Sequence, residues 1–135
     1  MRRPAAVAAV GVALALLAGC GDGDGDGDGG SDQPAGGYRE AAAALCTARD
    51  QARADLNKAR ATFYDRSHDA LHDISRDLDP VDRAASGRLL EAKQRVESAL
   101  DADPPPAGLV ADLQELADVT RAGLARLSVD VPPCA

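Results

Sequence analysis

From residue 38 to residue 127, apolar residues recur three, four or seven positions apart, a spacing that places side chains on one face of an α-helix. The segment is rich in Ala, Leu, Arg and Asp and shows no strand-like alternation. The pattern therefore predicts an all-α fold, a small antiparallel helical bundle over residues 38–130. Three apolar stripes form its expected core: Leu45, Ala52, Leu56, Ala59, Phe63, Leu71, Ile74 and Leu78; Val81, Ala85, Leu89, Ala92, Val96 and Leu100; Leu109, Leu113, Leu116, Thr120, Leu124 and Leu127.

Prolines separate these stripes. Asp79 and Pro80 are typical of a helix start, since aspartate caps free backbone N–H groups and proline is tolerated in the first turn. Asp103 is followed by three consecutive prolines, which cannot continue a helix. A second pair of prolines ends the last stripe, so residues 131–135 are expected to form a C-terminal tail.

The first 37 residues have a different composition. Two arginines precede an apolar run from Ala5 to Leu17, whose length suits a signal peptide and falls short of the ~20 residues of a membrane span. Residues 1–19 are therefore predicted to be a signal peptide, and the Gly- and Asp-rich residues 20–37 a flexible tether. The Gly-Asp repeat matches only the first half of an EF-hand calcium loop, because the required glutamate is missing.

Leu17, Ala18, Gly19 and Cys20 stand at the junction of the apolar run and the repeat. They resemble the lipobox of bacterial lipoproteins, in which Leu, a small residue and Gly or Ala precede Cys. The resemblance covers about twenty residues and implies that Cys20 carries a thioether-linked lipid and becomes the new amino terminus. It also implies a palmitate-type membrane anchor at the extracytoplasmic face of the cell membrane. The alternative is an ordinary secretory signal followed by a chance cysteine.

Cys46 and Cys134 would then lie in an oxidising environment, where disulfides persist. Residues 39–78 leave two arrangements open: one helix of about 60 Å, or two helices with a tight turn near residues 56–58, where Asn57 can adopt a left-handed conformation. A four-helix up-down bundle brings Cys134 within disulfide range of Cys46, whereas a three-helix bundle with one long first helix does not. The first arrangement is favoured, with a Cys46–Cys134 disulfide; two unpaired thiols are the alternative.

The charge balance restricts the class of partner. The chain has 15 basic and 22 acidic residues and a net charge of −7. Removal of Arg2 and Arg3 with the signal peptide leaves 13 basic residues and a net charge of −9. Such a surface repels nucleic acid and anionic headgroups, so membrane attachment is expected to depend on the lipid at Cys20.

Both histidines lie in one short segment that offers a candidate metal site. On a helix, His68 and His72 are four residues apart and share a face, with Asp65 and Asp69 three residues before each of them. Nitrogen and oxygen ligands at this spacing suit Zn²⁺, Cu²⁺ or Ni²⁺. The spacing of the two histidines is similar to that of zincin proteases, but the glutamate that these enzymes use as a base is missing. The competing interpretation is an ordinary solvated helix face.

No catalytic arrangement is evident, and we expect the protein not to be an enzyme. Ser67 and His68 are adjacent and point to different sides of a helix, so they cannot form a nucleophile–base pair. No glycine-rich loop joins a strand to a helix, and no small-molecule substrate is indicated. The sequence favours a membrane-anchored interaction or scaffold module whose partner is another envelope protein. A divalent-metal-binding lipoprotein is the alternative.

Overall fold

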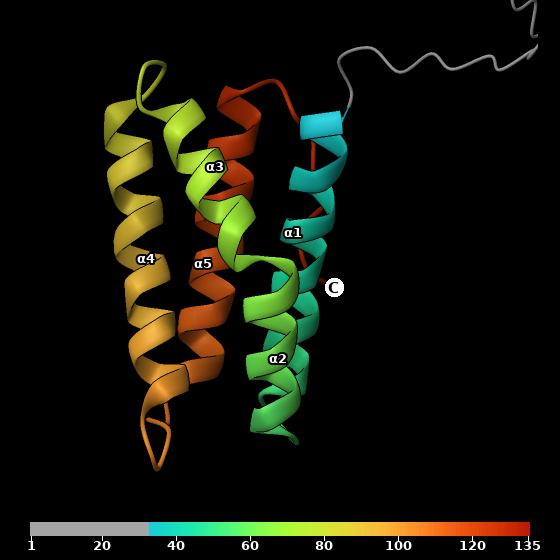
Figure 1. Cartoon of the computed structure of the whole chain (residues 1–135), viewed down its shortest axis with the longest axis vertical. Helices are drawn as coiled ribbons and strands as arrows, with labels where there is room; N and C mark the ends of the chain where they lie inside the picture. The colour runs from blue at the N-terminus through green and yellow to red at the C-terminus, as the bar shows by residue number, and fades with distance from the viewer. Residues whose placement is uncertain (1–32) are drawn as a thin grey trace, which may run out of the picture.

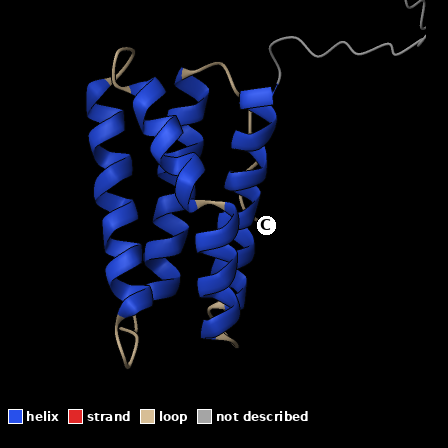
Figure 2. Cartoon of the chain, in the orientation of Figure 1, coloured by secondary structure: helices blue, strands red, loops and turns tan. Residues whose placement is uncertain are grey.

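The computed structural model describes residues 33–135, and these residues are helical without a strand (Figures 1 and 2). Five helices follow one another along the chain: α1 (Gln33–Gln51), α2 (Leu56–Arg66), α3 (His68–Leu78), α4 (Arg83–Asp101) and α5 (Leu109–Arg126). The predicted all-α class is therefore confirmed for this part of the chain. The predicted number of helices is wrong, because residues 39–78 contribute to three helices, neither one nor two.

The connection between α1 and α2 lies earlier than predicted. The expected turn near residues 56–58 is wrong, because Asn57 belongs to α2 and the chain leaves the helix at residues 52–55. Asp55 caps α2, since its side chain accepts a hydrogen bond of 3.0 Å from the backbone N–H of Lys58. An aspartate with this role fixes the start of the helix, and no left-handed residue is required.

The start of α4 also differs from the prediction. Asp79 closes α3, and its backbone N–H donates to the carbonyl of Ser75. The N-cap of α4 is Asp82, whose side chain accepts a 2.9 Å hydrogen bond from the backbone N–H of Ala85. Val81 consequently lies in the turn and is 60% exposed, outside the core stripe to which it was assigned. Asp79 and Asp82 could both cap a helix, and Asp82, which lies nearer to the first buried residue of α4, is the N-cap.

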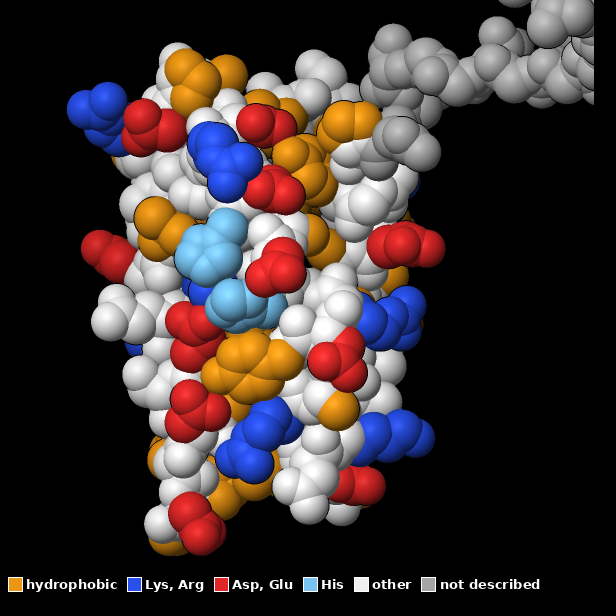
Figure 3. All heavy atoms as spheres, in the orientation of Figure 1, with side chains coloured by type: hydrophobic (Ala, Val, Ile, Leu, Met, Phe, Trp, Pro, Cys, Tyr) orange, Lys and Arg blue, Asp and Glu red, His pale blue; other side chains and the backbone are white. Residues whose placement is uncertain are grey.

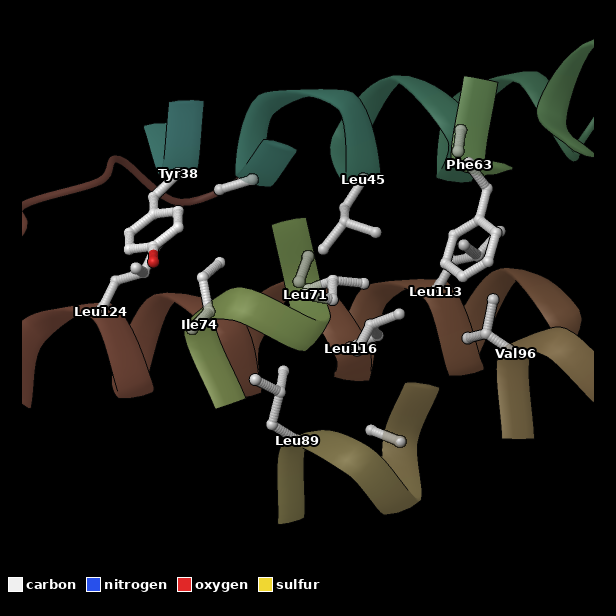
Figure 4. Close-up of a cluster of buried hydrophobic side chains, with 14 of the residues drawn as sticks. Tyr38, Leu45, Phe63, Leu71, Ile74, Leu89, Val96, Leu113, Leu116 and Leu124 are labelled. Atoms are coloured by element: carbon white, nitrogen blue, oxygen red, sulfur yellow. The ribbon is translucent and has the colours of Figure 1, made fainter. Parts of the chain in front are cut away.

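The helices enclose a single cluster of buried side chains (Figure 4). Leucine and alanine predominate, and Phe63 is the one phenylalanine of the chain. The large members that are almost fully buried come from all five helices: Leu45, Phe63, Leu71, Ile74, Leu78, Leu89, Val96, Leu100, Leu113, Leu116 and Leu124. The three predicted stripes thus supply most of the core.

The C-terminal tail leaves α5 through a sharp turn and returns beside α1. Ser128 adopts a φ of 59°, and the N–H of Val129 donates to the carbonyl of Leu124. Val129 and Val131 are buried, so residues 129–135 form a strap that packs on the bundle. In Figure 1 this strap ends next to α1.

Covalent and polar contacts fasten the strap to α1. Cys46 and Cys134 form a disulfide with their Cα atoms 5.4 Å apart, which confirms the predicted pairing. The buried side chain of Arg49 donates from Nη2 to the main-chain oxygen of Ala135 at 2.8 Å and from Nη1 to Gln114 Oε1 at 2.5 Å. One arginine therefore links α1, α5 and the strap.

Tyr38 connects the first turns of α1 to the end of α3. Its hydroxyl donates a 2.6 Å hydrogen bond to Asp77 Oδ2. Burial, followed by this bond to a carboxylate, raises the pKa of Tyr38 to about 12. The protonated hydroxyl is thus the form that the folded protein stabilises.

This pKa predicts a loss of stability in alkali. Between pH 10 and pH 12 the unfolded chain loses the Tyr38 proton while the folded chain retains it, so the free energy of unfolding falls as the pH rises. We expect Tyr38→Phe to flatten this fall when unfolding by urea is followed at several pH values. Below pH 10 the variant should show only the loss of one hydrogen bond, about 1 kcal/mol. An identical slope in both proteins would contradict the assignment.

Candidate functional site

A break at Ser67 places the histidine segment next to α4. Ser67 separates α2 from α3, and its buried hydroxyl donates a 3.0 Å hydrogen bond to the carbonyl of Ala41 in α1. Because this hydroxyl is engaged by α1, it does not cap α3. The two helices diverge at this point, and α3 leans toward α4 (Figure 1). His68, the first residue of α3, is thereby directed toward α4.

Both ring nitrogens of His68 face a carboxylate. Nε2 lies 2.9 Å from Glu97 Oε1 of α4, and Nδ1 lies 2.9 Å from Asp69 Oδ1. The same Glu97 oxygen accepts a 2.6 Å hydrogen bond from Lys93 Nζ, and the Lys93 side chain is buried. One oxygen of Glu97 therefore contacts both a lysine within α4 and the imidazole of α3.

Further side chains continue these contacts along α2. The Tyr64 hydroxyl donates to Asp101 Oδ1 at 3.2 Å, and Arg60 Nε donates to the carbonyl of Leu100 at 3.0 Å. Burial and the bond to Asp101 raise the pKa of Tyr64 above its ordinary value. Tyr64 also lies against His68, with 5.5 Å between ring centroids. Figure 3 shows the two histidines together on this face, with hydrophobic and charged side chains beside them.

The structure brings only some of the four predicted metal ligands together. His72 is exposed and its ring lies 5.1 Å from that of His68, while Asp69 contacts Nδ1 of His68. Asp65 is exposed and makes no hydrogen bond or ion pair with either imidazole in the described part of the chain. Across residues 33–135, no group of three or more His, Cys, Asp or Glu side chains is arranged to hold a metal ion. The predicted ligand set is therefore not assembled.

Lys93 and Glu97 are the members of this cluster that the sequence did not single out. Their spacing of four residues indicates an ion pair on one helix, which is common on exposed surfaces. Nothing in that spacing says that the lysine is buried or that α3 brings a histidine to the same carboxylate. Only the packing of α3 on α4 supplies this information. The cluster (His68, Asp69, Lys93 and Glu97) ties two helices together through the contact between His68 and Glu97.

Melting temperatures measured with Zn²⁺ or Cu²⁺ test whether this cluster only links helices or also binds metal. Micromolar metal is expected to leave the melting temperature of the full chain unchanged, because Glu97 is neutralised by Lys93 and both nitrogens of His68 are engaged. A metal that binds only the folded state must raise the melting temperature. A rise that disappears in the His68→Ala, His72→Ala double variant would contradict the expectation and restore the metal site.

The remaining predicted positions have different outcomes. Cys20, Leu17 and the predicted signal peptide and tether up to residue 32 lie outside the described residues. α1 begins at Gln33, so it includes five residues that the sequence assigned to the tether. None of the helices within residues 33–135 combines the length and the apolar character that crossing a membrane requires. Comparison of the chain with protein-family models, curated proteins and solved structures finds no significant match.

Proposed function

We propose that this chain is a lipid-anchored helical module that lies at the extracytoplasmic face of a bacterial cell membrane and docks on another envelope protein. The observation that carries the proposal is the sequence Leu17-Ala18-Gly19-Cys20, with an apolar run before it and an acidic glycine-rich repeat after it. A thioether-linked lipid at Cys20 would hold the protein at the membrane without a spanning helix. The repeat would keep the bundle away from the headgroups, because its aspartates repel one another.

The disulfide supports an extracytoplasmic location. Disulfides form and persist in oxidising compartments and are rare in the reducing cytosol. The Cys46–Cys134 bond closes a loop of 88 residues around a core made chiefly of alanine and leucine. A small bundle with such a core gains substantially from a covalent cross-link, which suits a protein exposed outside the cell.

The side chains of the His68 cluster support an interaction role more than a chemical one. His68, Lys93 and Glu97 form contacts between α3 and α4, and Tyr64 and Arg60 bond to the end of α4. Groups that could transfer protons or bind metal are thereby used to hold helices together. We therefore propose that the module acts through its surface and is not an enzyme.

We further propose that the five helices form four antiparallel limbs. In this arrangement α2 and α3 are two halves of one limb that is interrupted at Ser67. Support comes from the single non-helical residue between them and from the disulfide, which requires the end of the chain to lie beside α1.

Substitution of the anchor cysteine tests the location. The full chain, produced in a bacterial host, is expected to incorporate radiolabelled palmitate and to sediment with membranes. Cys20→Ser should abolish the label and the membrane association, whereas the Cys46→Ser, Cys134→Ser double variant should keep the label. If Cys20→Ser is still labelled and still sediments with membranes, the proposed anchor is wrong.

Docking is tested separately by chemical cross-linking of intact membranes. We expect one envelope protein to be enriched with the wild-type chain and lost with Cys20→Ser, which would not reach the same surface. Equal recovery of that protein with both chains would count against anchored docking.

A further inference from the structure

Two shallow hollows lie along the outer side of the seam between α4 and α5. One, of about 580 Å³, is bordered by Glu91, Arg95 and Asp112, and the other, of about 300 Å³, is bordered by Arg88 and Glu115. The α4 residues that line the two hollows extend from position 85 to position 99, which corresponds to about 20 Å along a helix. The hollows therefore border about four turns of α4, and the Arg95–Glu115 ion pair crosses the seam between them.

An exposed glycine lies in the same stretch of α4, although it lines neither hollow. Gly87 is in the body of α4, and a Cβ atom at this position would meet nothing within 4 Å. Glycine disfavours a helix relative to alanine, so a residue with a side chain would stabilise α4. Gly123 in α5 is different, because a Cβ there would lie 2.7 Å from Leu78 Cδ1. A glycine that the fold does not need is explained when another backbone approaches closely at that point.

Two opposite charges follow Gly87 on the outer side of α4. Arg88 and Glu91 are both exposed and lie three residues apart, so they point to the same side of the helix. Neither forms an ion pair in the described part of the chain, even though Arg95 and Glu115 pair across the same seam at 2.6 Å. These two charges are unpaired and about one helical turn apart. On a second, antiparallel copy of the same helix, each of them would face the opposite charge.

We propose that α4 is the interface of a homodimer, in which α4 of a second copy packs antiparallel across a two-fold axis between Arg88 and Glu91. In this arrangement Arg88 of each copy meets Glu91 of the other, because an antiparallel pair reverses the order of the two charges. Gly87 of each copy allows the two helix backbones to approach. The two hollows beside α4 receive side chains of the second copy.

The charges favour a second copy over an unrelated helix. A two-fold axis makes every contact twice, so one Arg–Glu pair on the sequence becomes two pairs in the dimer. The proposal does not depend on lipid anchoring or on an envelope partner. It concerns a different property from the proposed function, and each can fail without the other.

Charge reversal tests the register of the interface. The full chain in mild detergent is expected to show a concentration-dependent monomer–dimer equilibrium in sedimentation velocity. Arg88→Glu and Glu91→Arg should each weaken the dimer at least about tenfold, because each places like charges against one another twice. The double variant Arg88→Glu, Glu91→Arg should restore it. Lys58→Glu, which makes the same charge change on the exposed surface of α2, should have no effect.

Gly87→Gln provides a second test that separates the interface from folding. The larger side chain should weaken the dimer at least about tenfold, while it raises the melting temperature of the monomer because glutamine favours a helix. A chain that is monomeric at every accessible concentration would overturn the proposal. So would a dimer whose stability is the same in all of these variants, since association would then occur elsewhere.

Discussion

Replacement of both Cys46 and Cys134 by serine is expected to lower the free energy of unfolding by about 3–5 kcal/mol. The disulfide joins residues separated by 88 positions, and without it the unfolded chain gains the conformational freedom of a long open loop. The folded chain would also hold its strap less firmly. Two buried valines and the hydrogen bonds from Arg39 to Asp130 and from Arg49 to Ala135 would be left to keep residues 129–135 on the bundle.

Urea unfolding of the full chain, followed by circular dichroism, measures this loss. The oxidised wild type should unfold at a higher urea concentration than the double serine variant, and a dithiol reductant should move the wild type to the variant's midpoint. The double serine variant is its own control, because the reductant should leave its midpoint unchanged. A difference below about 1 kcal/mol between oxidised wild type and variant would show that the strap and the packing suffice without the bond.

Truncation of Phe63 to alanine is expected to lower the free energy of unfolding by about 3–5 kcal/mol. Its ring is fully buried, and Figure 4 shows it close to Leu113 of α5 and Val96 of α4. Its neighbours in a core of alanine and leucine offer little volume with which to fill the space. The loss therefore combines the transfer of an aromatic side chain with the cost of a cavity.

A conservative variant distinguishes lost volume from general disruption. Phe63→Leu keeps most of the apolar surface and should cost less than about half as much as Phe63→Ala in the same urea experiment. Substitution of the exposed Ala61, two residues before Phe63 in α2, by serine should change stability by less than about 0.5 kcal/mol. Equal losses for alanine and leucine at position 63 would mean that the aromatic ring itself, through its contact with Tyr64, is required.

The apolar spacing predicted the helical class and most of the core because periodicity records which face each helix buries. Leu89, Val96, Leu113 and Leu124 are buried as their stripes predict. The cysteine pairing could also be predicted, since only a chain that folds back on itself brings residues 46 and 134 together. These predictions depend on spacing and chain length, which a sequence displays directly.

Helix ends were less predictable, because several residues with the right chemistry compete for each cap. Asp55 and Asp82 cap helices. Asn57, predicted in a turn, lies within α2, and Pro80, predicted at the start of a helix, lies in the turn before α4. The break at Ser67 had no detectable signal. Its cause is a hydrogen bond to the carbonyl of Ala41, a residue 26 positions away, which exists only in the packed structure.

In the candidate site, too, local spacing predicted some residues and tertiary packing determined the others. The sequence identified His68 and Asp69 by their spacing, and the structure places them in contact. It could not identify Glu97 as the second partner of His68, because the relation between α3 and α4 depends on how far α3 tilts after Ser67. Local spacing therefore named half of the cluster, and tertiary packing decided that the cluster links helices.

The position of the disulfide determines how the bundle would respond to mechanical force. A pull between residue 33 and the end of the chain follows α1 to Cys46 and then passes through the covalent bond to Cys134. Helices α2 to α5 lie inside the bridged loop and carry no direct tension. Only residues 33–45 can be drawn out, to a fully stretched length of roughly 45 Å. In the oxidised protein, force would thus unfold the first part of α1 and leave helices α2 to α5 folded.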